Sequence, residues 1–214
     1  MTDEKEEKKI YYIKVILLGE AGIGKTNLIN TYTEEQYNPN ELSTANPCQS
    51  LHTIELKNRK LNIAFWDTMG QEKHRSITKT FIKGSNIVIF VYDITRRDTF
   101  LELNYWVNAT REELVNEEVI FGVAANKIDL FAQSQVDKEE GEDYAKSINA
   151  VFFETSAKSN IGFKNLVNNL LEQLLLNKNI IDKIEENQDI EQSFHLKDKK
   201  HRKQKEAWLC TGKG

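Results

Sequence analysis

The fold of this chain follows from the stretch Gly19-Glu20-Ala21-Gly22-Ile23-Gly24-Lys25-Thr26, which fits the pattern G-x-x-x-x-G-K-[ST] at every fixed position. Residues 12–18 before it are rich in branched apolar side chains and predict a buried strand. Residues 27–32 after it can continue as a helix. A glycine-rich loop between strand and helix lets backbone N–H groups turn toward one anion, and the helix dipole adds positive potential. An ordinary glycine turn is the alternative, but both flanks favour a phosphate-binding loop.

Two side chains of the loop carry its chemistry. The pattern indicates that Lys25 reaches the β- and γ-phosphates of a nucleotide and that the hydroxyl of Thr26 binds Mg²⁺. The other positions offer backbone groups. We expect contacts with the nucleotide from Gly19, Glu20, Ala21, Gly22, Ile23, Gly24 and Asn27 as well.

Composition excludes several classes of protein. The 214 residues carry a formal net charge of −4, which argues against general nucleic-acid binding because that needs a broad basic surface. The two cysteines, Cys48 and Cys210, form no disulfide framework or zinc-site spacing, so we expect a reducing, cytoplasmic compartment. No apolar run is long enough to span a bilayer. Residues 2–9 lack the apolar core of a signal peptide.

Strand patterns alternate with helical patterns along the chain. After the first strand, strands are expected at 51–56, 61–66, 86–92, 119–125 and 151–154. The first two of these form a hairpin across Asn58-Arg59. An apolar helical face includes Phe100, Leu101, Leu103, Trp106 and Val107, with Asp98 as the N-cap, and a longer stripe runs from Phe163 to Leu175.

This alternation predicts an α/β fold of the phosphate-loop nucleoside triphosphatase (P-loop NTPase) class. We expect a mostly parallel six-stranded sheet with one antiparallel edge strand, helices on both faces, and ligands at the carboxyl ends of the strands. Residues 1–9 are expected to be a charged disordered arm and residues 10–176 the globular domain. Residues 177–214 are expected to be a flexible tail with a basic run at 197–205 and Cys210 near its end.

Two further motifs follow strands of the sheet and indicate which nucleotide base is bound. Asn126-Lys127-Ile128-Asp129 suits guanine, because a carboxylate accepts from the N1–H and the 2-amino group, a donor pair that adenine lacks. Ser156, Ala157 and Lys158 follow the next strand, where a backbone N–H can meet the guanine O6. After the hairpin, Asp67 can hold Mg²⁺ through water and Gly70 can present its N–H to a γ-phosphate.

Taken together, these motifs resemble the Ras superfamily of small GTPases over roughly residues 10–176, with about five motifs in the right order. The Rab branch is the most similar, through the segments 66–72 and 92–95 and through Thr53-Ile54-Glu55-Leu56 and Glu154-Thr155-Ser156-Ala157-Lys158. The resemblance implies GTP or GDP and Mg²⁺ as ligands, with Mg²⁺ held by Thr26, Thr44 and Asp67.

The resemblance also assigns roles in the two switch loops. Thr44 would bind Mg²⁺ and the γ-phosphate, Tyr37 would pack against the guanine, and Gln71 would orient the attacking water. Lys25 and Thr44 complete the catalytic set with Gln71. For Tyr37, a partly exposed loop tyrosine is the alternative. Hydrolysis is expected to be slow without an activating protein.

This sequence departs from the family pattern at several positions. Residues 45–49 replace the usual hydrophobic first-switch motif, so that Gln49 stands where an aromatic side chain normally joins the effector surface. The other two aromatic positions are kept as Trp66 and Phe81. Met69 and Ala21 replace a customary alanine and a frequent glycine. Cys210 is followed by four residues, one more than in the C-a-a-X prenylation box that it resembles, and they include no aliphatic pair.

The leading hypothesis is therefore a monomeric GTP-hydrolysing switch in vesicle trafficking. Its expected partners are an exchange factor, a GTPase-activating protein, effectors that bind the switches, and a membrane surface reached through lipidation of Cys210. It would then lie peripherally on the cytosolic face of intracellular membranes. One alternative is a nucleotide-bound interaction module with negligible turnover. Another is an ATP-using phosphate-loop enzyme, which Asn126-Lys127-Ile128-Asp129 opposes.

Overall fold

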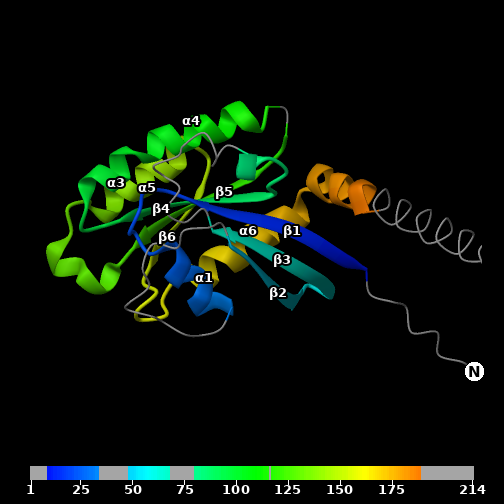
Figure 1. Cartoon of the computed structure of the whole chain (residues 1–214), viewed down its shortest axis with the longest axis horizontal. Helices are drawn as coiled ribbons and strands as arrows, with labels where there is room; N and C mark the ends of the chain where they lie inside the picture. The colour runs from blue at the N-terminus through cyan, green and yellow to red at the C-terminus, as the bar shows by residue number, and fades with distance from the viewer. Residues whose placement is uncertain (1–8, 34–47, 68–79, 116, 189–214) are drawn as a thin grey trace, which may run out of the picture.

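Six strands form one sheet in the order β2-β3-β1-β4-β5-β6, in a computed structural model that describes residues 9–33, 48–67, 80–115 and 117–188 (Figure 1). All neighbouring strands are parallel except β2 and β3, which are antiparallel at one edge. The strands are β1 (Ile10–Leu18), β2 (Cys48–Leu56), β3 (Arg59–Asp67), β4 (Ile87–Asp93), β5 (Ile120–Asn126) and β6 (Val151–Thr155). The predicted sheet is confirmed, including its one antiparallel edge strand.

The hairpin and the central strands follow directly from local sequence. Lys57 and Asn58 join β2 to β3 with φ angles of 49° and 61°, the paired positive values that a tight two-residue hairpin turn requires. Every residue of β4 is buried. A parallel strand covered on both faces has no solvent side, which explains why its sequence is a continuous apolar run rather than an alternating one.

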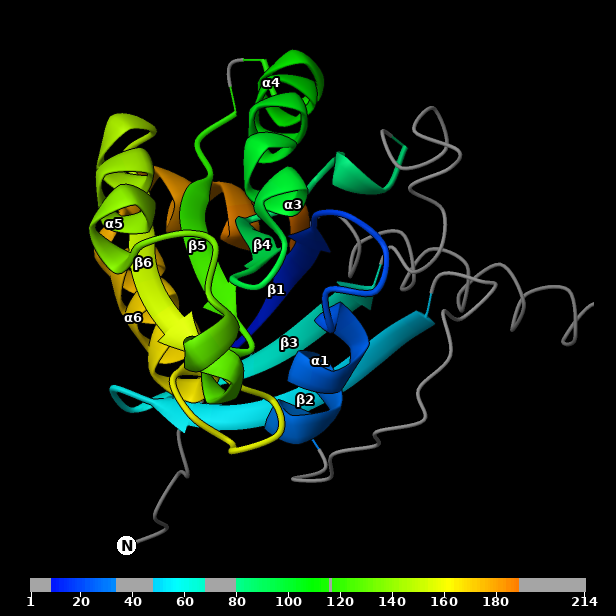
Figure 2. The same ribbon diagram turned by 90° about the vertical axis from the view of Figure 1, so that its left-hand side faces the viewer.

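Helices cover both faces of the sheet, as expected (Figures 1 and 2). The helices are α1 (Lys25–Thr33), α3 (Arg97–Leu101), α4 (Leu103–Glu113), the 3₁₀ helix η2 (Ile128–Gln133), α5 (Lys138–Ser147) and α6 (Phe163–Leu176). The helices pack on the sheet through two separate hydrophobic cores. Leu28 of α1 and Leu166 of α6 belong to one core. Phe100, Trp106 and Ala145, from α3, α4 and α5, belong to the other.

The predicted tail begins with a helix instead. Residues 178–188 are helical, and we call this segment the C-terminal helix. Asn177 begins it, because its Oδ1 accepts from the backbone N–H of Ile180 at 3.2 Å. Ile180, Ile181 and Ile184 are 7% exposed or less and join the core formed by α6. The expectation of a flexible tail from residue 177 is therefore wrong for residues 177–188.

The C-terminal helix packs beside the start of β1 (Figure 1, orange and dark blue). The hydroxyl of Tyr11 donates to Glu185 Oε1 at 2.9 Å, and Lys9 Nζ lies 2.8 Å from Glu185 Oε2. At the other end, the side-chain amides of Asn177 and Asn179 both donate to the carboxylate of Glu118, at 2.8 and 2.6 Å. The helix is thus attached at both of its ends.

Two details of the helix expected around residue 100 also differ. The N-cap position of α3 is Arg96, and Asp98 lies in the first turn, where its carboxylate accepts from Arg96 at 3.0 Å. Leu101 is 57% exposed, whereas Phe100, Leu103, Trp106 and Val107 are buried. The chain forms two short helices, α3 and α4, rather than one, so the single apolar stripe does not continue through Leu101.

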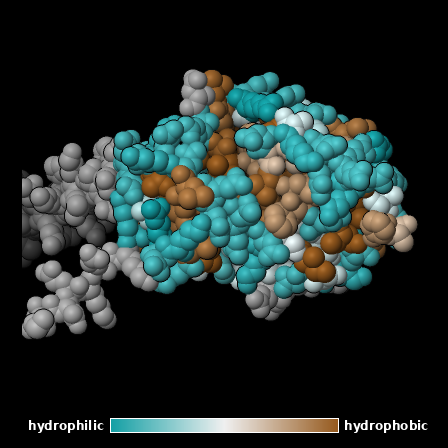
Figure 3. Space-filling model, turned by 180° about the vertical axis from the view of Figure 1, so that it is seen from behind, coloured by the Kyte–Doolittle hydropathy of each residue, from teal (hydrophilic) through white to brown (hydrophobic). Residues whose placement is uncertain are grey.

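Hydrophilic residues predominate on the face shown in Figure 3, and hydrophobic residues form separate patches between them. In the parts of the chain that the structure describes, no helix is both long and apolar enough to cross a membrane.

Candidate functional site

The candidate site residues meet because neighbouring strands end at the same level. Strand pairing sets Leu17 opposite Asp67, and Asp93 opposite Asn126, which is in turn opposite Thr155. All of these pairs are parallel, so the segments that follow β1, β3, β4, β5 and β6 leave the sheet at one edge. The sequence motifs that were predicted to act together all follow these strand ends.

The phosphate loop, residues 19–26, is held through its carbonyl oxygens, both by its own Lys25 and by side chains from later segments. Five consecutive carbonyls accept from side chains: Gly19 and Glu20 from Lys25 Nζ (both 2.8 Å), Ala21 from Arg96 Nη1 (3.1 Å), Gly22 from Lys127 Nζ (2.9 Å) and Ile23 from Asn126 Nδ2 (2.7 Å). Across a trans peptide, the C=O of one residue and the N–H of the next point in opposite directions. The N–H groups of residues 22–24 therefore face away from Arg96, Lys127 and Asn126, on the side where an anion would bind.

Gly19 and Gly24 make this close packing possible. Gly19 has a φ of 145°, and a Cβ on it would lie 2.2 Å from the carbonyl oxygen of Val91. Gly24 has a φ of 95°, and a Cβ on it would lie 2.8 Å from Asn126 Nδ2. Any larger residue at either position would push the loop away from the strand ends that hold it.

Oxygen atoms that could bind a magnesium ion lie at the same edge. Thr26 and Asn27 are in the first turn of α1, directly after Lys25, which is 5% exposed. Asp67 ends β3 and is 4% exposed. The described residues contain no cluster of three or more histidine, cysteine or acidic side chains that could hold a metal alone. A hydroxyl and one carboxylate instead fit Mg²⁺, which keeps waters and binds substrate phosphates as further ligands.

Asn126 and Lys127 join the base-recognition motif to the loop. Asn126 is 1% exposed, and its Oδ1 accepts from Thr155 Oγ1 at 3.2 Å while its amide donates to the loop. Lys127 adopts a left-handed backbone conformation, with φ 68° and ψ 37°. That turn ends β5 sharply. The Lys127 ammonium lies between the Gly22 carbonyl oxygen and the carboxylate of Asp93, at 2.9 and 2.7 Å.

Asp93 is a site residue to which sequence reasoning assigned no role. It is 1% exposed at the end of β4, and its Oδ1 accepts from the N–H and the hydroxyl of Thr95, at 2.9 and 2.7 Å. A carboxylate at the end of an otherwise apolar central strand is the signal that could have indicated it. Arg96 was missed too, because no motif of the sequence relates it to residue 21.

Asp129, Ser156 and Lys158 come together from separate segments, as predicted. Ser156 Oγ donates to Asp129 Oδ1 at 2.6 Å and accepts from the N–H of Ser159 at 3.1 Å. Lys158 Nζ lies 3.9 Å from Asp129 Oδ2, and the Asp129 side chain is 15% exposed. The loop after β6 thus orients the carboxylate through both of its oxygens.

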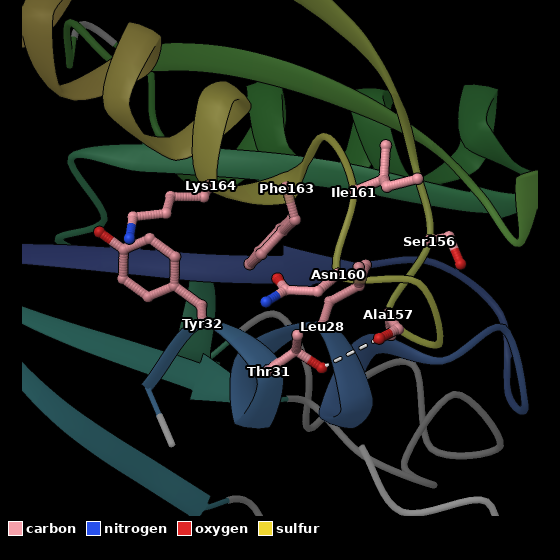
Figure 4. Close-up of a pocket in the computed structure, with 9 residues that line it drawn as sticks. All are labelled: Leu28, Thr31, Tyr32, Ser156, Ala157, Asn160, Ile161, Phe163 and Lys164. Atoms are coloured by element: carbon pink, nitrogen blue, oxygen red, sulfur yellow. Dashed lines mark hydrogen bonds between the residues drawn. The ribbon is translucent and has the colours of Figure 1, made fainter. Parts of the chain in front are cut away.

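Helix α1 supports the loop that carries Ser156 and Ala157 (Figure 4). Thr31 Oγ1 donates to the carbonyl oxygen of Ala157 at 3.4 Å, the interaction drawn as a dashed line. Two backbone bonds of 3.0 Å between Ser156 and Ile161 close the loop on itself. Both halves of the site, the phosphate loop with α1 and the loop after β6, are therefore attached to each other.

Several predicted residues lie outside the described part of the chain: Tyr37, Thr44, Gly70, Gln71 and Cys210. Of the aromatic pair expected on the effector surface, Trp66 and Phe81 do lie together, with ring centroids 5.7 Å apart. This aromatic contact thus joins the end of β3 to residue 81.

Comparison with known proteins decides the family. The family model described as Ras family matches residues 14–176. The chain belongs to the Ras family of small GTPases, in its Rab branch. It is 35% identical to the Ras-related protein Rab-21 of Homo sapiens over 167 residues. The aligned region covers 78% of this chain and 74% of that protein. The Ras-related protein Rab-18 of Lymnaea stagnalis is 31% identical over 171 residues, 80% of this chain and 84% of that protein.

Membership defines the activity. This Rab-branch protein is a GTPase and a small GTPase switch of membrane trafficking. Ras-family GTPases in general bind GTP or GDP together with Mg²⁺. Members of the Rab branch interact with exchange factors, GTPase-activating proteins and effectors, and they associate with intracellular membranes.

Proposed function

We propose that this chain binds GTP with Mg²⁺, hydrolyses it to GDP, and recruits effector proteins only in its GTP state. The observation that carries the proposal is the set of bonded carbonyls from Gly19 to Ile23, because three of their side-chain donors come from motifs assigned to phosphate and base. The same residues that would read the guanine also shape the phosphate loop. Recognition of the base and binding of the phosphates are therefore parts of one structure.

Guanine selection is assigned to Asp129. Its carboxylate would accept from the N1–H and the 2-amino group of the base, while Ser156 Oγ donates to Oδ1 at 2.6 Å. Residues 156–158 would offer backbone N–H groups to the guanine O6. Tyr37 would cover the base from the first switch loop.

Magnesium binding is assigned to Thr26, Thr44 and Asp67. The ion would neutralise negative charge on the β- and γ-phosphates, which is the chemistry it supplies in this class. Asp67 is buried at the end of β3, and its pairing opposite Leu17 sets it beside the start of the phosphate loop. That placement suits a carboxylate that acts through a bound water.

Hydrolysis is assigned to Gln71, which would orient the attacking water while Lys25 stabilises the charge on the phosphates. Gln71→Leu should keep nucleotide binding and slow hydrolysis, since the phosphate loop is untouched. Thr26→Asn should weaken Mg²⁺ binding and favour GDP. Without an activating protein we expect turnover to take on the order of an hour, because an arginine from such a partner accelerates this class ~10³–10⁵-fold.

The effector surface would centre on Trp66 and Phe81. Lys14 Nζ lies 4.7 Å from the centroid of the Trp66 ring, so the aromatic surface is partly covered by a cation. Trp66 is paired in register with Gln49, which by the family resemblance stands in place of an aromatic residue. We infer that this chain selects effectors that tolerate a polar group and a positive charge at this patch.

Membrane attachment is assigned to the segment after residue 188. A lipid on Cys210 would act together with the basic run 197–205, because one lipid chain alone gives only marginal membrane binding. Each basic residue adds about 1 kcal/mol of binding free energy near an anionic leaflet. Intact-mass measurement of the protein from its native cell, with Cys210→Ser as the comparison, tests this. If the native protein has the mass of the unmodified chain and Cys210→Ser leaves membrane association unchanged, the tail binds the membrane by charge alone or does not bind it.

The main test combines two measurements on the purified full chain. Nucleotide extracted from it should be GDP or GTP, and single-turnover hydrolysis should be slow but measurable, and slower still in Gln71→Leu. Adenine nucleotide in the extract would contradict guanine selection. Bound guanine nucleotide without any turnover would instead support the interaction-module alternative, which the unusual residues 45–49 and Ala21 favour.

A further inference from the structure

Arg96 is fixed where β4 meets α3, at the edge of the phosphate loop. Its backbone N–H donates to the carbonyl oxygen of Asp93 at 3.0 Å. Its own carbonyl oxygen accepts from the N–H and the hydroxyl of Thr99, at 3.1 and 2.7 Å. With φ −133° and ψ 95°, the residue is extended just before the helix begins. Three backbone contacts therefore determine where its side chain starts.

The guanidinium of Arg96 lies against two residues of the loop. Nη1 donates to the carbonyl oxygen of Ala21 at 3.1 Å, and the same nitrogen would be 3.9 Å from a Cβ placed on Gly22. Nη2 donates to Asp98 Oδ2 at 3.0 Å. The guanidinium is thus held between a carboxylate and the loop, with 43% of the side chain exposed.

The role of Arg96 differs from that of the other donors to the loop. Lys25, Asn126 and Lys127 belong to the phosphate and base motifs, whereas Arg96 belongs to neither. It is the donor on Ala21, whose peptide orients the N–H of Gly22 toward the anion side. Of the groups that face the Arg96 guanidinium, Asp98 is the carboxylate, and Arg96 lowers the pKa of Asp98, so that Asp98 is charged at neutral pH.

We propose that Arg96 is a positioning residue that orients the Ala21–Gly22 peptide and favours the triphosphate over the diphosphate. The proposal rests on the GTP-binding function proposed above. A fixed cation beside the loop attracts the nucleotide that carries one more negative charge more strongly, since Coulomb energy scales with the product of the charges. Asp98 opposes this attraction. Removal of the Asp98 charge should therefore shift the preference further toward GTP.

The test is the dissociation rate of fluorescent GDP and of a fluorescent non-hydrolysable GTP analogue from the full chain with Mg²⁺. Arg96→Ala should release the GTP analogue roughly three- to ten-fold faster, as expected for loss of a charge-assisted hydrogen bond that is partly exposed, and GDP clearly less so. Arg96→Lys should restore part of the ratio between the two rates. Asp98→Asn should change that ratio in the opposite direction.

Arg97→Ala is the matched control. Arg97 is the next residue and points elsewhere, to Glu140 at 2.6 and 2.8 Å and to the carbonyl oxygen of Gln135 at 3.1 Å. Its removal should leave the ratio unchanged. Equal acceleration of both nucleotides in Arg96→Ala, or none, would overturn the proposal. If the wild-type chain retains no guanine nucleotide, the proposed function fails first and independently of Arg96.

Discussion

Lys127 Nζ lies 2.7 Å from the buried carboxylate oxygen Oδ2 of Asp93, and this ion pair connects the base-recognition motif after β5 to the end of β4. The same ammonium donates to the carbonyl oxygen of Gly22 at 2.9 Å. One side chain therefore joins a central strand, the guanine motif and the phosphate loop. Disturbance of the pair should be felt at the nucleotide even though Asp93 is not assigned a contact with it.

Asp93→Asn should accelerate release of both GDP and GTP by roughly ten-fold and lower the free energy of unfolding by about 1–3 kcal/mol. The amide cannot neutralise Lys127, which is 31% exposed and so is only partly compensated by water. Release of fluorescent nucleotide and urea unfolding measure the two effects. Asp143→Asn is the control: its partner Lys146 is 71% exposed, and neither quantity should change appreciably.

Asp129→Asn should move nucleotide preference from guanine toward xanthine. An amide can donate to a carbonyl at position 2 of the base, where a carboxylate can only accept. Competition between GTP and xanthosine triphosphate for the fluorescent-nucleotide site measures the change. Unchanged affinity for GTP in Asp129→Asn would mean that the base is read by other residues.

Ile184→Ala should destabilise the protein by about 2–4 kcal/mol, because it removes buried methyl and methylene groups and leaves a cavity in the core. Ile184 is 5% exposed, between the C-terminal helix and the sheet. Leu176→Ala, at the end of α6, is the control, since Leu176 is 76% exposed and its loss should cost under about 0.5 kcal/mol. Equal urea midpoints for the two variants would show that the C-terminal helix is not docked in solution.

Glu185 makes the docking of this helix sensitive to pH. Hydrogen bonds from Lys9 and then Tyr11 hold the pKa of Glu185 below its ordinary value. A carboxylate whose pKa is lowered by folding stabilises the native state fully above its unfolded pKa of about 4.3. That stabilisation is lost as the pH falls through the lower, folded pKa. The difference in unfolding free energy between wild type and Glu185→Gln should therefore be present near neutral pH and shrink in acid. A difference independent of pH would contradict this assignment.

Periodicity and motif spacing sufficed for the sheet and for the placement of Lys25, Asn126 and Asp129, because these depend on local pattern. Helix α5 was not anticipated, since its sequence is mostly charged and it buries only Gly141 and Ala145. The C-terminal helix was mistaken for tail because its polar composition outweighed three isoleucines at helical spacing.

Arg96 and Asp93 depend on contacts between segments that no single stretch of sequence records. The carbonyl oxygen that Arg96 binds lies 75 residues earlier in the chain. The lysine that Asp93 pairs with follows a different strand. Which carbonyl or carboxylate a side chain meets is decided by the order of strands in the sheet, and spacing along the chain carries little information about it.

The hydrogen bond between Tyr11 and Glu185 joins residues 174 positions apart, close to the two ends of the part of the chain that the structure describes. The first strand of the sheet can therefore acquire its last neighbour only after residue 185 has been synthesised. Contacts between such distant segments close large loops and slow folding. During translation, the start of β1 would remain uncovered until then, and exposed apolar surface at that stage promotes aggregation. Chaperone binding to nascent chains that stop before the C-terminal helix should accordingly exceed binding to chains that include it.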